Sequence, residues 1–276
     1  MKKVYDTINQ YCVEHELLTN GDGIVIGLSG GMDSVCLLQV LAALRNEWRL
    51  RLVCVHVHHG IRGTAADEDA AFAQRLAAKY NISFRLYEMD IPQLAKEQGL
   101  SEEETGRNYR YRCFEEVRKE LNFDKIAVAH HRDDQAETVL WQILRGSSLR
   151  GVCGMRAGRA NIIRPLLCLD RQQIEQIVRE NGDGWREDAT NREEKYTRNK
   201  IRNRVFPYIE QEIQPMARRH LVELAEDCQR AWDYIERQML EQYERLVYRD
   251  GDTFCFSVDE WKQVDPYLQG QLLMHI

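Results

Sequence analysis

Residues 24–34 of the chain read Ile-Val-Ile-Gly-Leu-Ser-Gly-Gly-Met-Asp-Ser, and this stretch decides the fold. Residues 24–28 are apolar and mostly β-branched, so we expect a buried strand there. From residue 32 to residue 44 apolar side chains recur at helical spacing, which predicts a helix. A strand, a glycine turn and a helix therefore follow one another directly.

The turn at residues 29–34 carries the residue types of an anion-binding loop. Its glycines allow a tight turn and leave no Cβ between the backbone and a ligand. The helix that follows offers free N–H groups and the positive end of its dipole. The serines add hydroxyl donors, and Asp33 is a carboxylate where a phosphate-bound Mg²⁺ needs one. The alternative is an ordinary turn capped by a serine or an aspartate. We assign to ligand binding Ser29, Gly30, Gly31, Met32, Asp33 and Ser34, with Asp33 as the metal ligand.

Composition and cysteine usage predict a cytoplasmic globular protein. The 276 residues are 43% apolar and 30% charged, and no run approaches the ~20 apolar residues of a membrane span. Residues 1–18 lack the apolar core of a signal peptide. The eight cysteines form no C-x-x-C pair, which favours reduced thiols over disulfides or a metal site. The apolar residues 271–276 have no C-cap, so we expect a chain truncated within a longer protein.

The net charge of −6 argues against a uniformly basic nucleic-acid surface and leaves local patches open. Residues 145–164 hold five arginines and no acid, and residues 192–204 hold six basic residues against two glutamates. Such clusters are either solvated faces or phosphate contacts, and the sequence allows both.

Strand and helix patterns alternate between residues 24 and 144. We expect strands over residues 24–28, 52–58, 84–89 and 125–129, and helices over 35–44, 66–80, 101–121 and 135–144. This alternation predicts an α/β fold, a Rossmann-like parallel sheet with helices on both faces. Long charged helical patterns over 209–245 and a strand-like segment at 253–258 indicate a smaller, mainly helical domain. We place the boundary near Phe206, which gives domains 1–205 and 206–276.

A second polar segment, His-His-Arg-Asp-Asp at residues 130–134, follows the fourth predicted strand. Ligands of parallel sheets bind beyond the carboxyl ends of the strands, so this segment and the 29–34 loop are expected at one edge. A helix starting near Asp133 puts Asp134 with Thr138, and Asp133 with Glu137, on shared faces. A histidine beside a carboxylate is an acid–base or orienting pair. N-capping by Asp133 with solvated histidines is the alternative.

Two other clusters have competing interpretations. His56 and His58 would share one face of a strand, which suggests a metal-dependent hydrolase, although the Asp-His continuation typical of such sites is missing. Arg107, Arg110 and Tyr111 share a helix face. This arginine pair either neutralises phosphate in a cleft or lies on an outer face, with Glu103 pairing to Arg107.

Together these segments resemble the tRNA(Ile)-lysidine synthetases, a family of PP-loop ATP pyrophosphatases. The resemblance spans residues 20–205. It rests on Ser-Gly-Gly-Met-Asp-Ser at 29–34, His-His-Arg-Asp-Asp-Gln-Ala-Glu-Thr at 130–138, Glu-Asp-Ala-Thr-Asn at 187–191 and Arg-Asn-Lys-Ile-Arg at 198–202. The departures are small: Gly106 stands where alanine is usual, and His58 where asparagine is usual.

The resemblance implies a two-step reaction. AMP from ATP is transferred to the C2 oxygen of the wobble cytidine of isoleucine tRNA with a CAU anticodon, and the ε-amine of free lysine then displaces AMP. It implies ATP and Mg²⁺ as cofactors and Asp33, Arg107, His131 and Asp134 as catalytic residues, with Arg110 as the alternate to Arg107. It also implies Arg145, Arg198 and Arg202 as tRNA contacts. The sequence leaves a homodimer open.

Two further classes compete with this interpretation. A PP-loop tRNA thiolase would usually carry C-x-x-C pairs, which this chain lacks. An inert nucleotide- or RNA-binding module would not need the acidic and basic groups that accompany the loop.

Overall fold

The computed structural model describes residues 2–58, 64–186 and 197–276. They form two compact units. The first unit comprises Met1–Glu137 and Met155–Val205, and the second comprises Thr138–Gly154 and Phe206–Ile276. The boundary that we expected near Phe206 is one of the points where the chain changes unit.

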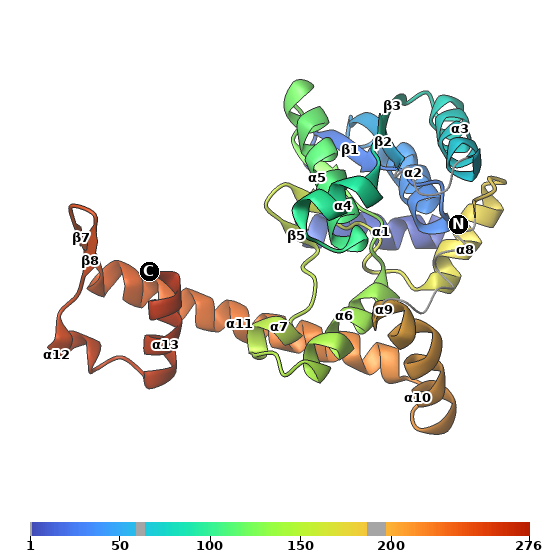
Figure 1. Cartoon of the computed structure of the whole chain (residues 1–276). Coiled ribbons are helices and arrows are strands. Elements are labelled where there is room, and N and C mark those ends of the chain that lie inside the picture. The colour runs from blue at the N-terminus through green and yellow to red at the C-terminus, as the bar shows by residue number, and fades with distance from the viewer. Residues whose placement is uncertain (1, 59–63, 187–196) are drawn as a thin grey trace. The chain divides into compact units, whose positions relative to one another are not determined.

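The first unit is built on a six-stranded sheet with the order β3-β2-β1-β4-β6-β5 (Figure 1). Its long strands are β1 (Gly23–Gly27), β2 (Arg51–His58) and β3 (Ser83–Glu88), and its short ones are β4 (Lys125–Ala127), β5 (Gly158–Arg159) and β6 (Ile162–Ile163). All neighbouring pairs are parallel except β5 with β6. The α/β prediction is confirmed, and so are the four predicted strands. The strands β5 and β6 were missed because two residues are too few to show an alternating pattern.

Helices cover both faces of this sheet (Figure 1). Alternation along β1 sends Ile24 and Ile26 into one core cluster and Val25 into another. The larger cluster joins the sheet to α1 (Lys2–Glu14), α2 (Met32–Leu44), α3 (Thr64–Lys79) and α8 (Arg171–Glu180). On the other face Val25 packs with Phe114 and Val117 of α5 (Glu102–Glu120), and α4 (Ile91–Gln98) packs on α5. The predicted layered architecture is therefore present.

Three helices carry the segments that the sequence singled out. Helix α2 is buried on nearly every side, which explains why apolar residues dominate its sequence. Helix α6 (Arg132–Leu144) begins directly after β4 and its short exit, one residue before the expected start at Asp133. Helix α9 (Thr197–Lys200) continues into a π-helical turn, η2 (Ile201–Val205). Such wide turns occur frequently at functional sites.

The second unit is mainly helical, as expected. It contains α7 (Leu149–Val152), α10 (Phe206–Glu212), α11 (Ala217–Leu246), α12 (Val258–Trp261) and α13 (Pro266–His275), with a hairpin of β7 (Tyr248–Asp250) and β8 (Thr253–Cys255). The single helical pattern expected over residues 209–245 is divided between α10 and α11. Pro215 lies in the break, where its missing N–H and its ring disfavour a continuous helix.

Residues 138–154 belong to the second unit, whereas the sequence boundary had placed them in the first domain. Contacts made by α7 explain the difference. The Arg150 guanidinium lies 5.9 Å from the ring centroid of Trp232, and the Gln229 amide donates to the Cys153 carbonyl at 2.6 Å. These contacts join segments far apart in sequence, so no local pattern could reveal them.

The structure bears on two further predictions, one about membrane-spanning segments and one about the state of the cysteines. No helix in the described part of the chain is long and apolar enough to cross a membrane. All eight cysteines are free. Burial raises the pKa of Cys12 and of Cys54 to about 12, so both remain protonated thiols inside the core.

Candidate functional site

The 29–34 loop leaves β1 and enters α2 with its serines turned onto its own backbone. The Ser34 hydroxyl donates to the Gly31 carbonyl at 2.8 Å and accepts the Gly30 N–H at 3.1 Å. Ser29 Oγ lies 3.1 Å from Ser34 Oγ and accepts the Gly31 N–H at 3.3 Å. The hydroxyls that we expected to serve a ligand therefore hold the loop in shape.

Gly30 is required by this shape. Its φ of +88° is a conformation that residues with a Cβ avoid, and an added Cβ would lie 3.4 Å from the Phe72 ring. Gly31 is the N-cap of α2 and has no side chain to cap the helix. The N–H groups of the first turn of α2 are therefore available for an anion, at the positive end of the dipole.

Asp33, in this first turn, faces His131 from the exit of β4. Asp33 Oδ2 lies 3.7 Å from His131 Nε2, and its Oδ1 is buried without a hydrogen-bond partner among the described residues. Burial raises the pKa of Asp33, the charge of His131 lowers it, and the charge of Asp134 raises it. One oxygen of the carboxylate is thus desolvated while the side chain is 34% exposed, and its charge is only partly compensated, which suits it to receive a cation.

His131 is held in one tautomer. Its Nδ1 accepts the backbone N–H of Asp133 at 3.3 Å, so the ring proton lies on Nε2 when the ring is neutral. Nε2 is 3.5 Å from Asp134 Oδ2, and the His131 backbone N–H donates to that same oxygen at 3.0 Å. His131 is 1% exposed, so this N–H points between two carboxylates in a closed environment. This geometry favours an orienting donor over a base.

Asp134 belongs to a compact cluster of two carboxylates and two arginines. Arg198 donates to Asp134 and Glu137 at 2.9 Å each. Arg202 donates to Asp134 at 2.8 Å and to Glu137 at 2.6 and 2.9 Å. Burial raises the pKa of Asp134, but His131 and the two arginines outweigh it and lower the pKa to about 2. Each charge of this cluster is therefore compensated.

Glu137 was missed as a site residue. The sequence paired Asp133 with Glu137 on one helix face, whereas the structure brings Asp134 and Glu137 to the same two arginines. A spacing of three residues is as compatible with a shared face as a spacing of four, so the sequence could not choose between them. The arginines that decide it lie more than 60 residues further along the chain.

Arg186 was also missed. Its backbone N–H donates to the Gly30 carbonyl at 2.9 Å, and its guanidinium pairs with Asp69 at 2.8 Å and Glu68 at 2.7 Å. Arg186 therefore ties the loop to α3. Only its place next to the 187–191 motif could have drawn attention to it.

The sequence left two clusters with competing interpretations, His56 with His58 and Arg107 with Tyr111. Some of these side chains make contacts within the fold. The ring Nδ1–H of His56 donates to the Leu28 carbonyl at 2.8 Å, which ties β2 to the start of the loop. No group of three or more His, Cys, Asp or Glu side chains that could hold a metal occurs among the described residues. Arg107 lies over the Tyr111 ring at 5.3 Å and forms no ion pair with Glu103 in the described part of the chain.

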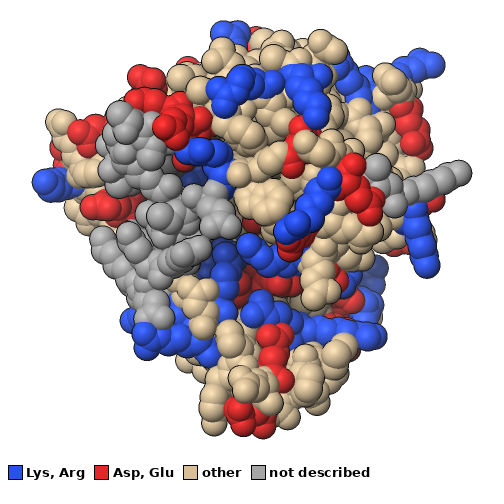
Figure 2. Space-filling view, turned by 90° about the vertical axis from the view of Figure 1, so that its right-hand side faces the viewer, with Lys and Arg blue, Asp and Glu red and all other residues tan. Residues whose placement is uncertain are grey.

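The remaining predicted residues are distributed as follows. Arg145 lies in the second unit, directly after α6. The 187–191 motif falls outside the described residues. On the face shown in Figure 2, Lys and Arg side chains lie among Asp and Glu side chains and not in one continuous basic surface. On this face the charges therefore favour local phosphate contacts, as the net charge did.

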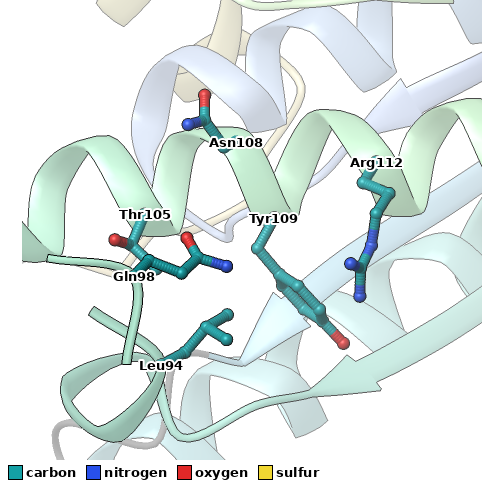
Figure 3. Close-up of a pocket in the computed structure, with 6 residues that line it drawn as sticks. All are labelled: Leu94, Gln98, Thr105, Asn108, Tyr109 and Arg112. Atoms are coloured by element: carbon teal, nitrogen blue, oxygen red, sulfur yellow. The ribbon is translucent and has the colours of Figure 1, made fainter. Parts of the chain in front are cut away.

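A small pocket lies away from these residues, between α4 and α5 (Figure 3). It is lined by Leu94, Gln98, Thr105, Asn108, Tyr109 and Arg112. None of these belongs to the 29–34 loop or to the 130–134 segment, so the pocket is separate from the candidate site.

Comparison with known proteins connects this geometry to a family. The family model described as a PP-loop domain matches residues 2–209. The chain is 41% identical, over 99% of its length, to a tRNA(Ile)-lysidine synthase of Caldanaerobacter subterraneus subsp. tengcongensis, and 36% identical, over 97%, to one of Clostridium perfringens. It covers 58% and 56% of these relatives, so it spans little more than half of their length.

A solved structure supports the fold. The U34-tRNA thiolase NcsA of Methanococcus maripaludis matches with a TM-score of 0.66 and 18% identity, over 82% of this chain and 77% of that one. At this identity the similarity concerns the fold alone.

Proposed function

The chain belongs to the PP-loop domain family, and from this premise we propose that it forms lysidine on isoleucine tRNA with a CAU anticodon. The proposed reaction transfers AMP from ATP to the C2 oxygen of the wobble cytidine, with pyrophosphate as leaving group. It then joins the ε-amine of free lysine to C2, with AMP as leaving group. The similarity to named lysidine synthases over nearly the whole chain supports this substrate assignment.

One observation carries the proposal: the open anion-binding turn and an unsatisfied carboxylate lie together at the carboxyl edge of the sheet. The first turn of α2 presents N–H groups, and Asp33 in that turn has a buried oxygen without a partner among the described residues. Phosphates and their counter-cation need this combination.

The residues present fit Mg²⁺. Magnesium is usually held by one or two carboxylates together with substrate phosphates and waters, so a single available carboxylate beside a phosphate-binding turn is sufficient. Asp33 would hold it, and the ion would neutralise charge on the phosphates. A Mg²⁺ site of this kind does not need three or more protein ligands, and no such group occurs among the described residues.

His131 and Asp134 would orient the groups around the lysine amine, with His131 acting as a donor and not as a base. Asp134 is ionised at neutral pH, because its pKa is about 2, but Arg198 and Arg202 already balance its charge, so an ammonium group would have to take the place of one of these arginines. His131 Nε2–H lies within 3.7 Å of Asp33 and 3.5 Å of Asp134, and it would orient both carboxylates. Arg107, or Arg110 as its alternate, would offset charge that develops on the transferred phosphoryl group.

Arg145, Arg198 and Arg202 remain our proposed tRNA contacts. Arg198 and Arg202 bind Asp134 and Glu137, so phosphate binding by these two requires an exchange of partners or the use of their remaining N–H groups. The cytidine must also leave its stack to reach the sheet edge. We assign catalysis to residues 1–205 and tRNA recognition to residues 206–276, in the cytoplasm.

Incorporation of radiolabelled lysine into unmodified isoleucine tRNA tests the function. With ATP and Mg²⁺ we expect labelling that disappears when the wobble cytidine is replaced by uridine. A full-length relative measured in parallel separates loss of activity caused by chain length from a wrong assignment. If this chain releases pyrophosphate on another substrate but never labels this tRNA, the PP-loop chemistry stands and the substrate assignment is wrong.

A further inference from the structure

Arg164 is a buried cation for which the described residues provide no counter-charge. The residue is 8% exposed, its Nε has no hydrogen-bond partner, and its Nη1 donates to the Arg156 carbonyl at 2.8 Å. A guanidinium has five N–H donors, and a buried charge without a partner is strongly unfavourable. Within the described ranges, therefore, no acidic side chain balances the charge of Arg164.

The topology places Arg164 at the edge where the other site residues lie. It follows β6 directly, and β6 runs parallel to β4, with Ala127 beside Ile163. The Val128 N–H donates to the Ile163 carbonyl at 3.1 Å, so the pairing continues beyond the assigned strands. Arg164 thus lies beside the exit of β4 that leads to His130 and His131.

His130 provides a second unsatisfied group at this place. Its Nδ1 is buried and has no hydrogen-bond partner within the described ranges. Burial lowers the pKa of His130 to about 3, Asp134 opposes this shift, and Arg164 and Arg107 add to it. His130 is therefore neutral and lies within electrostatic reach of both the carboxylate Asp134 and the two arginines.

We propose that Arg164, at the exit of β6 next to the exit of β4, receives the α-carboxylate of the lysine substrate. This inference rests on the proposed function. A free amino acid carries an anionic α-carboxylate, and at the β4 exit Arg164 is the cation whose charge no acidic side chain among the described residues balances. A guanidinium binds a carboxylate through two parallel hydrogen bonds, which adds geometric selectivity.

The location separates this receptor from the phosphate site. In the strand order β4 lies between β1 and β6, so the strand that leads to Arg164 is two strand spacings, or about 10 Å, from the strand that leads to the 29–34 loop. Its burial also disfavours a tRNA phosphodiester, because such contacts come mainly from side chains at the protein surface. A small ligand is the better occupant.

Isothermal titration of the 276-residue chain with L-lysine and with cadaverine, which lacks the carboxylate, tests the proposal. Both titrations include Mg²⁺ and a non-hydrolysable ATP analogue. The wild-type chain should prefer lysine. Arg164→Gln should weaken lysine binding by roughly 10- to 100-fold, the usual effect of losing a charged hydrogen bond, and leave cadaverine within about 3-fold.

Two further variants serve as controls for this experiment. Arg159→Gln removes the same charge from an exposed arginine on β5 whose field reaches Arg164, and it should change the lysine affinity far less than Arg164→Gln does. Arg164→Lys keeps the charge without the planar fork and should give an intermediate loss for lysine. The dissociation constant is the readout, because an unfolded fraction changes the stoichiometry and not the constant.

Three outcomes overturn the proposal: an unchanged lysine affinity in Arg164→Gln, an equal loss for lysine and cadaverine, or a loss confined to tRNA binding, which would mark a phosphodiester contact. If the wild-type chain binds no lysine, the proposed function fails with it. If the Arg164→Gln chain binds lysine with the same preference over cadaverine as the wild type, the assignment of Arg164 to the carboxylate is wrong and the proposed function stands.

Discussion

Asp33 and Asp134 lie at the same sheet edge, both near His131 Nε2, and their surroundings are opposite. Asp134 receives the two guanidinium groups of Arg198 and Arg202 and a backbone N–H, and its pKa falls to about 2. Asp33 has a buried oxygen with no partner in the described part of the chain, and burial raises its pKa. Two carboxylates of the same kind are thus prepared for different tasks.

The protein itself balances the charge of Asp134, whereas the charge of Asp33 is left for a ligand to balance. The cluster of Asp134, Glu137, Arg198 and Arg202 is complete without a substrate, so it should contribute to stability. Asp33 is incomplete, so its ionised form should cost stability and serve binding. Arg164 differs from this cluster in the same way, because no acidic side chain among the described residues balances its charge.

Removing one partner of the complete cluster should have the largest effect. Glu137→Gln leaves Arg202 with a buried, poorly compensated charge, since the Glu137 side chain is 0% exposed. We expect a loss of about 3–5 kcal/mol in the free energy of unfolding, measured by urea denaturation.

Glu115 gives the matched control for this prediction. It pairs with Arg118 at 2.8 Å but is 32% exposed, so Glu115→Gln should cost less than about 1 kcal/mol. Equal losses in the two variants would show that the buried cluster has no special weight.

Asp33→Asn should reverse this pattern, with a large loss of activity and no loss of stability. Removing a group that acts on developing charge lowers rates by about 10²–10³-fold. We therefore expect this decrease in tRNA-dependent pyrophosphate release, with a melting temperature equal to or above that of the wild type. Near-normal adenylation would eliminate the metal-binding role of Asp33.

The pH dependence of stability should differ in sign between the two aspartates. The pKa of Asp134 is about 2 in the folded chain against an ordinary 3.8, so its stabilisation is present above about pH 4 and is lost as the pH falls through 2. At about 1.4 kcal/mol per pH unit this amounts to about 2 kcal/mol. The raised pKa of Asp33 acts oppositely, because protonation favours the folded state.

Urea denaturation of wild type, Asp134→Asn and Asp33→Asn between pH 2 and 7 checks this. The stability deficit of Asp134→Asn should shrink on acidification, and any advantage of Asp33→Asn should also shrink. Differences from the wild type that stay constant with pH would contradict the assigned environments.

The smallest predicted effect tests the backbone conformation of the 29–34 loop independently of the charge of Asp33. Gly30→Ala forces a Cβ into a φ of +88° and should cost about 1–2 kcal/mol in thermal or urea unfolding. Gly31→Ala has an ordinary φ of −72° and open space except for Ser29 Oγ at 3.5 Å, so it should stay within about 0.5 kcal/mol. Equal costs would mean that loop strain does not arise at Gly30.

Much of the fold could be predicted because its determinants are local. The β1 run, the glycine turn and α2 are consecutive in sequence, and each is specified by the periodicity or conformational freedom of neighbouring residues. The strands β5 and β6 could not be predicted, since they exist only through pairing with each other and with β4.

The site was predicted in its residue types and only partly in its contacts. Sequence placed Asp33, His131 and Asp134 at one edge, as the structure does. It did not indicate that Arg198 and Arg202 bind Asp134 and Glu137, that Arg186 holds the Gly30 carbonyl, or that Arg164 lacks a counter-charge in the described part of the chain.

The sequence by itself therefore determined the strand–loop–helix unit, the parallel sheet and the family resemblance, because these depend on patterns within short segments. Only the tertiary structure decided which charges are compensated and which remain for a ligand. The partners of Asp134 come from 64 and 68 residues away, and that of Arg186 on α3 from 117. Charge balance depends on distance in space, and the folded chain alone sets that distance.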